Sequence, residues 1–445
     1  MIDLAKLAIQ VPEILLPKAG IDLTKWAVIA CDQYTSEPEY WSTVDGEVGD
    51  APSTLRLTFP EVYLEENDSN RRIVAINRAM ASYLDEGVLG SEGPGFVLLD
   101  RKTAHAPSRK GLMVALDLEQ YDYLPGAKTL IRATEGTIVD RLPPRIRVRE
   151  QASIELPHIM VLIDDPEQTV IEPLLNEELP QIYDFELMQN GGHLRGWRVE
   201  QPRLLSQVGE ALQQLADPQR FKSRYQVEDE DVMLYAMGDG NHSFATAKAI
   251  WEQLKEQASD PEEVMDHPAR YALVELVNLH DPGLEFEAIH RLLFDIDVED
   301  LLAGAEAYFA EAGTPCRRVK AESFAAAKEA VSAASGHAIP FVTVGEAGLL
   351  IVDQPALTLV VATLQGFLDI YLKERPKARI DYIHGDETVA RLGSRPGSIG
   401  FHLPAISKHD LFRTIVRDGA LPRKTFSMGE ADEKRFYLEA RKIVR

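Results

Sequence analysis

The residues of this chain that are best suited to chemistry follow directly after an apolar run, Val232–Met237. They are consecutive in the sequence: Gly238, Asp239, Gly240, Asn241, His242 and Ser243. The two glycines let the backbone come close to a ligand. Asp239 supplies a carboxylate, and His242 supplies an imidazole, the side chain that titrates nearest neutral pH. We therefore expect this Gly-Asp-Gly turn to bind an anion beside an acid–base group.

The residues after the turn predict the helix that positions it. Phe244, Ala247, Trp251 and Leu254 fall on one helical face, so we expect a core-packed helix over 244–256 with Ser243 as its N-cap. The first turn of such a helix offers free N–H groups and the positive end of the dipole, which favour an anion. A simpler interpretation stays open, in which Asp239 and His242 only satisfy backbone donors of a tight turn.

A second polar segment, Ile131–Arg145, is rich in arginine. Its charged residues are Arg132, Glu135, Asp140, Arg141 and Arg145. Arginine binds carboxylate or phosphate through a bidentate fork, so this segment is a candidate basic pocket. On charge pattern alone, a solvated loop with ion pairs is favoured instead.

The other histidines give weaker patterns. His280 and Asp281 belong to an Asp-Pro-Gly turn, and His290 lies in an apolar setting, so we expect structural roles for them. His384 and Asp386 lie at a predicted strand end, but two residues do not make a metal site. The sequence patterns of zinc metalloproteases, α/β-hydrolases, P-loop proteins and Rossmann proteins are absent.

Composition indicates an ordinary soluble protein. The 445 residues include 47 Lys plus Arg against 71 Asp plus Glu, a formal charge of −24. Such a surface repels phosphate backbones and anionic lipid, so we expect neither nucleic acid nor membrane as a partner. Two cysteines exclude a disulfide framework, and the N-terminal segment lacks a signal-peptide layout. We expect a cytoplasmic location; the oligomeric state is not predicted.

Strand-like and helix-like segments alternate without a strict βαβ rhythm, which indicates an α/β or α+β fold with a mixed sheet in its main domain. We expect a main domain over 1–297 and a smaller α+β domain or insertion over 298–377. A C-terminal segment over 378–445 is expected to pack back on the main domain. Within the smaller domain we expect three strands, at 341–344, 349–352 and 357–361.

Several segments together resemble a known family. They are Asp32-Gln-Tyr34, Thr54-Leu-Arg-Leu57, Arg132–Arg141, Gly238-Asp-Gly-Asn-His242, His280-Asp-Pro-Gly-Leu284 with Ile289-His-Arg-Leu292, and Leu421-Pro-Arg-Lys-Thr-Phe426. Their order and spacing are similar to those of domain of unknown function 1015, a widespread prokaryotic family, over nearly the whole chain. The family name brings no established activity with it.

Members of that family carry Ala-Asp-Gly-His-His-Arg where this chain has Gly238–Ser243. That signature is similar to one in the ParB/sulfiredoxin superfamily, which includes nucleotide-using proteins and a free-serine kinase. The resemblance implies that Asp239, Gly240 and His242 contact phosphate or its metal. This chain departs from the signature at Asn241 and Ser243, and the second change removes an arginine fork. An arginine from 132–149 would have to replace it.

Three hypotheses follow. The first is an enzyme that transfers phosphoryl groups to a small polar metabolite, with ATP or ADP and Mg²⁺. In it, an arginine from 132–145 and the helix start hold phosphate, Asp239 binds Mg²⁺, and His242 or Glu135 positions or deprotonates the acceptor. The second is a ligand-binding or regulatory protein without catalysis. The third is a metal-dependent hydrolase that uses His242, His384 and Asp386.

Overall fold

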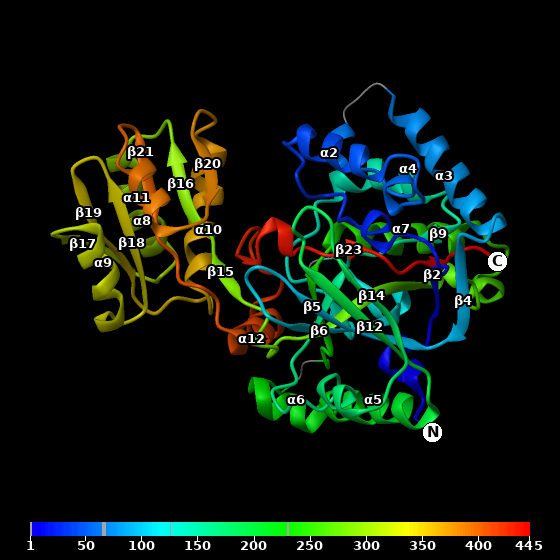
Figure 1. The fold of residues 1–445 in the computed structure, drawn as a ribbon. Helices are drawn as coiled ribbons and strands as arrows, with labels where there is room; N and C mark the ends of the chain where they lie inside the picture. The colour runs from blue at the N-terminus through cyan, green and yellow to red at the C-terminus, as the bar shows by residue number, and fades with distance from the viewer. Residues whose placement is uncertain (1, 65–67, 125, 229–230) are drawn as a thin grey trace. The chain divides into compact units, whose positions relative to one another are not determined.

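The chain divides into two compact units, and one is inserted into the other. In a computed structural model, residues 2–64, 68–124, 126–228 and 231–445 are described. Unit 1 consists of Met1–Glu285 and Gly429–Arg445, and unit 2 of Phe286–Met428 (Figure 1). Unit 2 is therefore wider than the range 298–377 expected from the sequence, and only 429–445 of the expected C-terminal segment belongs to unit 1. The boundaries 298 and 377 were expected from the block of Ala-rich helices. Unit 2 also includes the strands that precede and follow this block in the sequence.

A large mixed sheet forms the centre of unit 1, which confirms the predicted fold class. In spatial order its strands are β11 (Gln181–Glu186), β12 (His193–Val199), β5 (Phe96–Lys102), β6 (Arg109–Asp117), β14 (Tyr271–Asn278), β10 (Met160–Ile163), β13 (Tyr235–Asp239), β8 (Ile131–Arg132) and β7 (Tyr121–Asp122). β1 (Ile9–Gln10) also pairs with β6. The pairs β10–β14, β13–β8 and β7–β8 are parallel, and the other pairs in this sheet are antiparallel.

Helices cover both faces of this sheet. They are α1 (Leu23–Trp26), α2 (Pro38–Val48), α3 (Ser69–Asp85), α4 (Leu142–Arg149), α5 (Pro202–Leu215), α6 (Pro218–Tyr225) and α7 (Asn241–Gln257). On β5, Leu98 packs in one core with α5 and α7, while its neighbours Val97 and Leu99 pack in another with α2 and α3. Because successive strand side chains point to opposite faces, a continuous apolar run such as that of β5 requires cover on both sides. Figure 1 shows α2 and α3 on one side of the sheet and α5 and α6 on the other.

The last residues of the chain complete unit 1 through short strand pairs. β23 (Phe436–Tyr437) pairs with β3 (Val28–Ile29), and β24 (Arg441–Lys442) pairs with β9 (Ile154–Glu155). A further pair joins β2 (Glu13–Pro17) and β4 (Leu89–Pro94). These pairings bring residues near 30, 155 and 437 to one region of the unit.

Unit 2 has its own six-stranded sheet. The strand order is β17 (Cys316–Ala321), β19 (Glu346–Val352), β18 (His337–Thr343), β21 (Ser398–Phe401), β16 (His290–Phe294) and β20 (Arg379–Ile383). Its helices are α8 (Val298–Glu311), α9 (Phe324–Ala330), α10 (Val360–Glu374), α11 (Asp386–Gly393) and α12 (Lys408–Asp418). The strand expected at 357–361 is wrong, because residues 357–359 form no strand and α10 begins at Val360.

The two ends of unit 2 lie side by side. β15 (Phe286–Ala288) and β22 (Phe426–Met428) form an antiparallel pair in which Phe286 is opposite Met428. The chain therefore enters and leaves unit 2 at neighbouring positions. Among the described residues, none of the helices combines the length and apolar character needed to cross a membrane.

Candidate active site

The turn between β13 and α7 is built on Gly240. Its φ of 78° is a left-handed conformation that glycine adopts at little cost. A Cβ at this position would lie 3.0 Å from the Ile159 backbone, so a larger residue does not fit well. Gly240 is the N-cap, and α7 begins at Asn241. The expectation that Ser243 caps the helix is therefore wrong: Ser243 lies within the first turn, because the left-handed glycine turns the chain three residues earlier.

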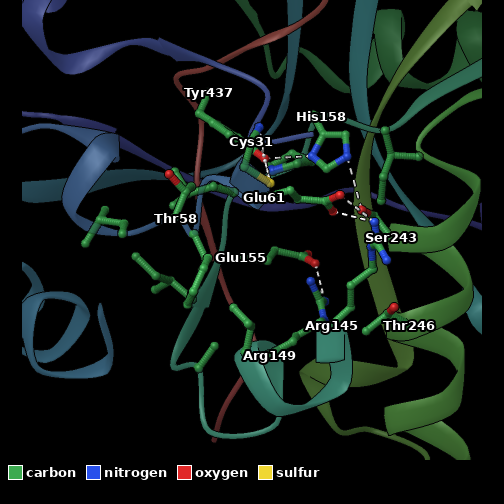
Figure 2. A pocket seen from close by; sticks show the side chains of 18 of the residues that line it. Cys31, Thr58, Glu61, Arg145, Arg149, Glu155, His158, Ser243, Thr246 and Tyr437 are labelled. Atoms are coloured by element: carbon green, nitrogen blue, oxygen red, sulfur yellow. Dashed lines mark hydrogen bonds and ion pairs between the residues drawn. The ribbon is translucent and has the colours of Figure 1, made fainter. Parts of the chain in front are cut away.

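Ser243 faces a histidine that comes from a distant part of the chain. Its Oγ lies 3.1 Å from Nε2 of His158, two residues before β10 begins. The other ring nitrogen, Nδ1, lies 2.8 Å from the Tyr437 hydroxyl on β23. That hydroxyl donates to Cys31 Sγ at 3.0 Å and accepts the Cys31 backbone N–H at 3.1 Å. A continuous row of polar contacts thus runs from Cys31 to the first turn of α7 (Figure 2).

Acidic groups surround this row. Asp32 Oδ2 lies 3.7 Å from Nε2 of His158. Burial, followed by the charges of Asp32 and Glu61, raises the pKa of the Cys31 thiol far above its usual range. Cys31 is therefore an uncharged thiol at neutral pH and not a nucleophile.

Arg145, an arginine of the 132–145 segment, lies on α4. It lines one pocket together with Ser243, His158 and Tyr437. Its Nη2 lies 2.5 and 2.6 Å from the two carboxylate oxygens of Glu61, in the 3₁₀ turn Glu61–Tyr63. Figure 2 shows the side chains of Glu61, His158 and Ser243 gathered at one end of this pocket.

The other arginines of the segment behave differently. Arg132, on β8, donates to the backbone oxygens of Thr129 and Asp231, which lie in the segments before β8 and β13. Arg141 is exposed, in the 3₁₀ turn Val139–Arg141 just before α4, and acts on His242 through its charge. Glu135 is half-buried and does not line the pocket. Of the charged residues Arg132, Glu135, Arg141 and Arg145 in this segment, Arg145 lines the pocket and the other three do not.

His242 is in an environment that keeps it uncharged. Burial, followed by the nearby charges of Arg145 and Arg141, lowers its pKa to about 4. Among the described residues, its Nε2 and the Asn241 Oδ1 are buried without a hydrogen-bond partner. At neutral pH a group with this pKa is a very weak base, which argues against His242 as the proton acceptor.

The Asp239 carboxylate forms an ion pair with a lysine. Its Oδ2 lies 3.2 Å from the Lys434 ammonium, and its Oδ1 accepts the Gly240 N–H at 2.8 Å. Burial alone would raise the pKa of this carboxyl, but Lys434, His158 and the Gly240 N–H together lower it below its usual range. The predicted Mg²⁺ ligand is therefore an ionised carboxylate that already has a cationic partner.

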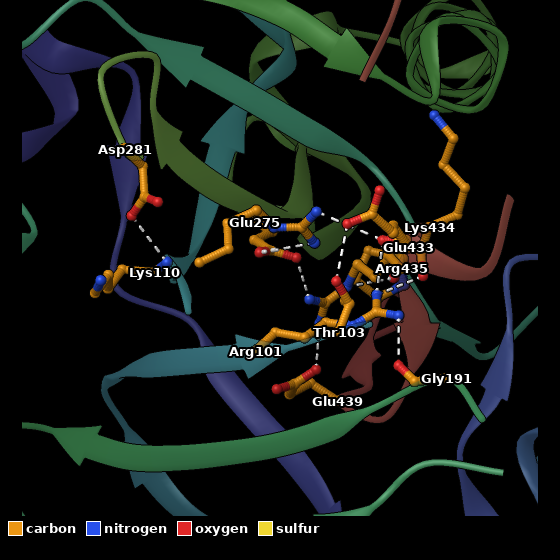
Figure 3. Close-up of polar contacts among 12 residues, drawn as sticks. Arg101, Thr103, Lys110, Gly191, Glu275, Asp281, Glu433, Lys434, Arg435 and Glu439 are labelled. Atoms are coloured by element: carbon orange, nitrogen blue, oxygen red, sulfur yellow. Dashed lines mark hydrogen bonds and ion pairs between the residues drawn. The ribbon is translucent and has the colours of Figure 1, made fainter. Parts of the chain in front are cut away.

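A buried polar network fixes the segment that carries Lys434 and Tyr437 (Figure 3). Arg101 on β5 donates to four backbone oxygens, those of Gly191, Asp432, Glu433 and Lys434. The Arg435 guanidinium pairs with Glu275 on β14 and with Glu439. Because all these charged side chains are buried, each requires its partners, and the segment has little freedom to move.

The remaining wall of the pocket is largely apolar. Leu57, Phe59, Met80, Val148 and Ile154 line it, together with a second ion pair of Arg149 and Glu155 at 2.5 Å. A polar end beside an apolar wall is typical of sites for small organic ligands, in which a few polar groups fix the orientation.

The third hypothesis required His242, His384 and Asp386 to act together. His242 belongs to unit 1, whereas His384 and Asp386 belong to unit 2. Asp386 accepts hydrogen bonds from His290 and Lys328, and its Oδ1 also lies 3.2 Å from His402 Nε2.

His290, Asp386 and His402 are the one group of possible metal ligands close enough together among the described residues. However, Nδ1 of His290 accepts the Leu403 N–H at 3.1 Å, so the ring proton lies on Nε2, which faces Asp386. That is the wrong tautomer for metal binding through Nε2.

Comparison with known proteins agrees with the resemblance seen in the sequence. Residues 15–371 match the family model described as "Protein of unknown function (DUF1015)". The chain belongs to this family. No curated protein matches the chain. The predicted family membership is therefore confirmed, and it brings no activity with it.

Among solved structures, the chain is similar to a variant of a free serine kinase in complex with AMP, with 10% identity and a TM-score of 0.40. That likeness covers 75% of this chain and 91% of the other. A conserved hypothetical protein from Pyrococcus furiosus has 10% identity and a TM-score of 0.37, with 75% and 95% covered. Another complex of a variant free serine kinase contains ADP and has a TM-score of 0.39, 10% identity, and 75% and 92% covered. Scores this low say nothing further about what this chain does.

Sequence reasoning missed His158, Tyr437, Lys434 and Glu61. The segment around Asp32 was noted only as family-like. His158, Glu61 and Tyr437 line the pocket, and Lys434 pairs with Asp239. Each has its contacts with residues far away in the sequence, and none has a local pattern that marks it. For Tyr437 and Lys434, which follow Leu421–Phe426, the family-like character of the C-terminal region was the one available signal.

Proposed function

We propose that unit 1 binds the phosphate group of a nucleotide at the start of α7 and transfers a phosphoryl group to a small polar metabolite. The observation that carries this proposal is the position of Arg145, which lines one pocket with Ser243 in the first turn of α7. Free N–H groups at a helix start and an arginine together favour a phosphate. Phosphoryl transfer depends mainly on positioning and charge stabilisation, which such a pocket supplies.

His158 is the base in this proposal. The Tyr437 hydroxyl donates its one proton to Cys31 Sγ. Toward Nδ1 of His158 the hydroxyl oxygen is therefore the acceptor, so Nδ1 carries the ring proton. Nε2 then presents a lone pair toward the pocket end at Ser243. Asp32, at 3.7 Å from Nε2, stabilises the imidazolium that forms when a proton is taken up.

Mg²⁺ enters the proposal as the partner of the nucleotide. It is usually held by one or two carboxylates together with substrate phosphates, and Asp239 and Asp32 both lie close to His158. The Lys434 ammonium already neutralises Asp239. If Lys434 alone offsets the negative charge of Asp239, nucleotide affinity should be the same with and without Mg²⁺. If Mg²⁺ is also needed, its removal should weaken nucleotide binding.

Calorimetry with ATP, ADP and CTP, each with and without Mg²⁺, tests the proposal. We expect binding of at least one nucleotide, and a loss of at least about tenfold in affinity for Arg145→Met, because a charged hydrogen bond contributes about 1.5–3 kcal/mol. Arg147→Met is the matched control, since Arg147 is exposed on the same helix. Absence of binding for all three nucleotides, or equal loss in both variants, would contradict the proposal.

A ligand-binding protein without catalysis is the second candidate, favoured by the departures at Asn241 and Ser243. The two candidates differ in what His158 does. If His158→Gln keeps nucleotide affinity and removes turnover of the nucleotide, catalysis is supported. If the wild-type protein binds nucleotide and turns none over with any hydroxyl-bearing acceptor, the regulatory function is favoured.

A further inference from the structure

The contact between Ser243 and His158 has the geometry of an activated nucleophile. The Ser243 Oγ lies 3.1 Å from Nε2, the nitrogen that carries the lone pair when Nδ1 donates to Tyr437. A hydroxyl beside a base, with the base oriented by a third group, is the arrangement that activates a serine. Both side chains line the pocket, so an electrophile that enters it meets the hydroxyl.

We propose that Ser243 is a nucleophile that accepts a phosphoryl group from a nucleoside triphosphate bound in this pocket. The donor rests on the function proposed above. In the step, Ser243 Oγ forms a bond to the γ-phosphorus, and the bond from that phosphorus to the β–γ bridging oxygen breaks. The hydroxyl proton moves to Nε2 of His158, and the nucleoside diphosphate leaves with the electron pair of the broken bond. The products are phosphoserine at 243 and the diphosphate, and the small metabolite accepts the phosphoryl group from this serine.

The surroundings of Ser243 stabilise the negative charge that this step places there. The N–H groups of Asn241, His242 and Ser243 lie in the first turn of α7, where a helix leaves them without intrahelical acceptors. Arg145 lines the same pocket. Asp32, on the other side, lies near Nε2 of His158 and balances the imidazolium. The helix start and Arg145 thus lie on the phosphoryl side, where the Glu61 carboxylate pairs with Arg145, and Asp32 lies on the proton side.

Thr246 provides an internal comparison. It lines the same pocket one turn later, but its Oγ1 donates to the His242 backbone oxygen at 2.7 Å. The hydroxyl proton is thus directed at a backbone carbonyl and not at an imidazole. We therefore expect Ser243, and not Thr246, to react.

The first experiment uses diisopropyl fluorophosphate, which reports a reactive serine without any nucleotide. The full chain is treated with this reagent, and the modified residue is identified by peptide mass spectrometry. We expect an adduct on Ser243, no adduct in Ser243→Ala, and labelling slowed by at least about a hundredfold in His158→Gln, the usual size of a lost general base. Thr246→Val should react like the wild type. An unmodified Ser243, or labelling that does not depend on His158, overturns the proposal.

The second experiment separates this proposal from the one on which it rests. The full chain is incubated with ATP and Mg²⁺, and phosphoserine at 243 is sought while nucleotide binding is followed by calorimetry. Phosphoserine that is absent in Ser243→Ala supports the nucleophile. Nucleotide binding without phosphoserine at 243 refutes the nucleophile and leaves the nucleotide site standing. Absence of binding, with the fluorophosphate adduct present, refutes the nucleotide and leaves a reactive serine.

Discussion

Two histidines near the start of α7 differ in what surrounds them, and the difference decides their chemistry. His158 has a hydroxyl at each ring nitrogen and a carboxylate nearby, so both its neutral and its charged forms have partners. His242 lies near Arg145 and Arg141, and its pKa is lowered to about 4. The residue that stands out in the sequence is thus kept neutral, and one that the sequence does not mark is placed to exchange protons.

The lowered pKa of His242 predicts an effect of pH on stability. In the unfolded chain the imidazole titrates near 6.5, and in the folded chain near 4. Between these values the unfolded state binds more protons, so this group lowers the free energy of unfolding as the pH falls from about 6.5 to 4. We expect His242→Gln to lose less stability than the wild type between pH 7 and pH 5, measured by urea unfolding.

His193 provides a control of opposite sign. Burial alone would lower its pKa, but its contacts with Glu186 and Asp184 raise it above the usual value. Its stabilising contribution is fully present below the unfolded pKa and is lost as the pH rises through the folded pKa. His193→Gln should therefore lose more stability toward acid than the wild type. Equal pH dependence in the wild type and both variants would show that neither histidine is shifted as described.

At the scale of elements, the helical pattern after the Gly-Asp-Gly turn predicts a helix that the structure has, whereas the long-range pairings were not predicted. The face of Phe244, Ala247 and Trp251 predicts α7, and all three residues are buried in the core. The start of α7 was misplaced because the pattern shows apolar spacing and not the left-handed conformation of Gly240. The Ser243–His158 pair joins residues 85 positions apart, and the His158–Tyr437 pair joins residues 279 apart. Such contacts depend on strand pairings that no local period specifies.

The C-terminal segment leads to a prediction about Arg101. This side chain is 3% exposed and donates to four backbone oxygens, two of them in buried hydrogen bonds and two in part-buried ones. We expect Arg101→Met to lower the free energy of unfolding by about 3 kcal/mol or more, because unsatisfied buried acceptors cost about 1–3 kcal/mol each. We also expect residues 429–437 to become sensitive to protease. Denaturant unfolding and limited proteolysis measure the two effects.

The control for Arg101 is Arg195→Met. Arg195 pairs with Asp100 on the same sheet, but its side chain is 46% exposed, so its loss should cost less than about 1 kcal/mol. A similar cost for both variants would mean that Arg101 does not fasten the C-terminal segment. A large cost with an unchanged protease pattern would assign Arg101 to the sheet alone.

At the scale of the whole molecule, unit 2 is an insertion with both ends at one place. Phe286 and Met428 are paired across β15 and β22, and paired residues in an antiparallel ladder lie about 5 Å apart. The residues of the proposed site, from Cys31 to Tyr437, all belong to Met1–Glu285 and Gly429–Arg445. The pocket thus requires both parts of unit 1 and none of the inserted residues.

This arrangement predicts that residues 286–428 can be removed. Joining Glu285 to Gly429 with a flexible linker of about two to four residues spans the gap between the paired ends. We expect the shortened chain to unfold cooperatively and to keep the fluorophosphate reactivity of Ser243. Trp26, Trp41, Trp197 and Trp251 are the four tryptophans of the chain, and all lie in unit 1, so tryptophan fluorescence follows this unit in both proteins. An unchanged denaturant midpoint supports two independent units. A lower midpoint together with loss of Ser243 reactivity would mean that the site requires unit 2. In that case, adding the isolated 286–428 fragment to the shortened chain should restore the reactivity of Ser243.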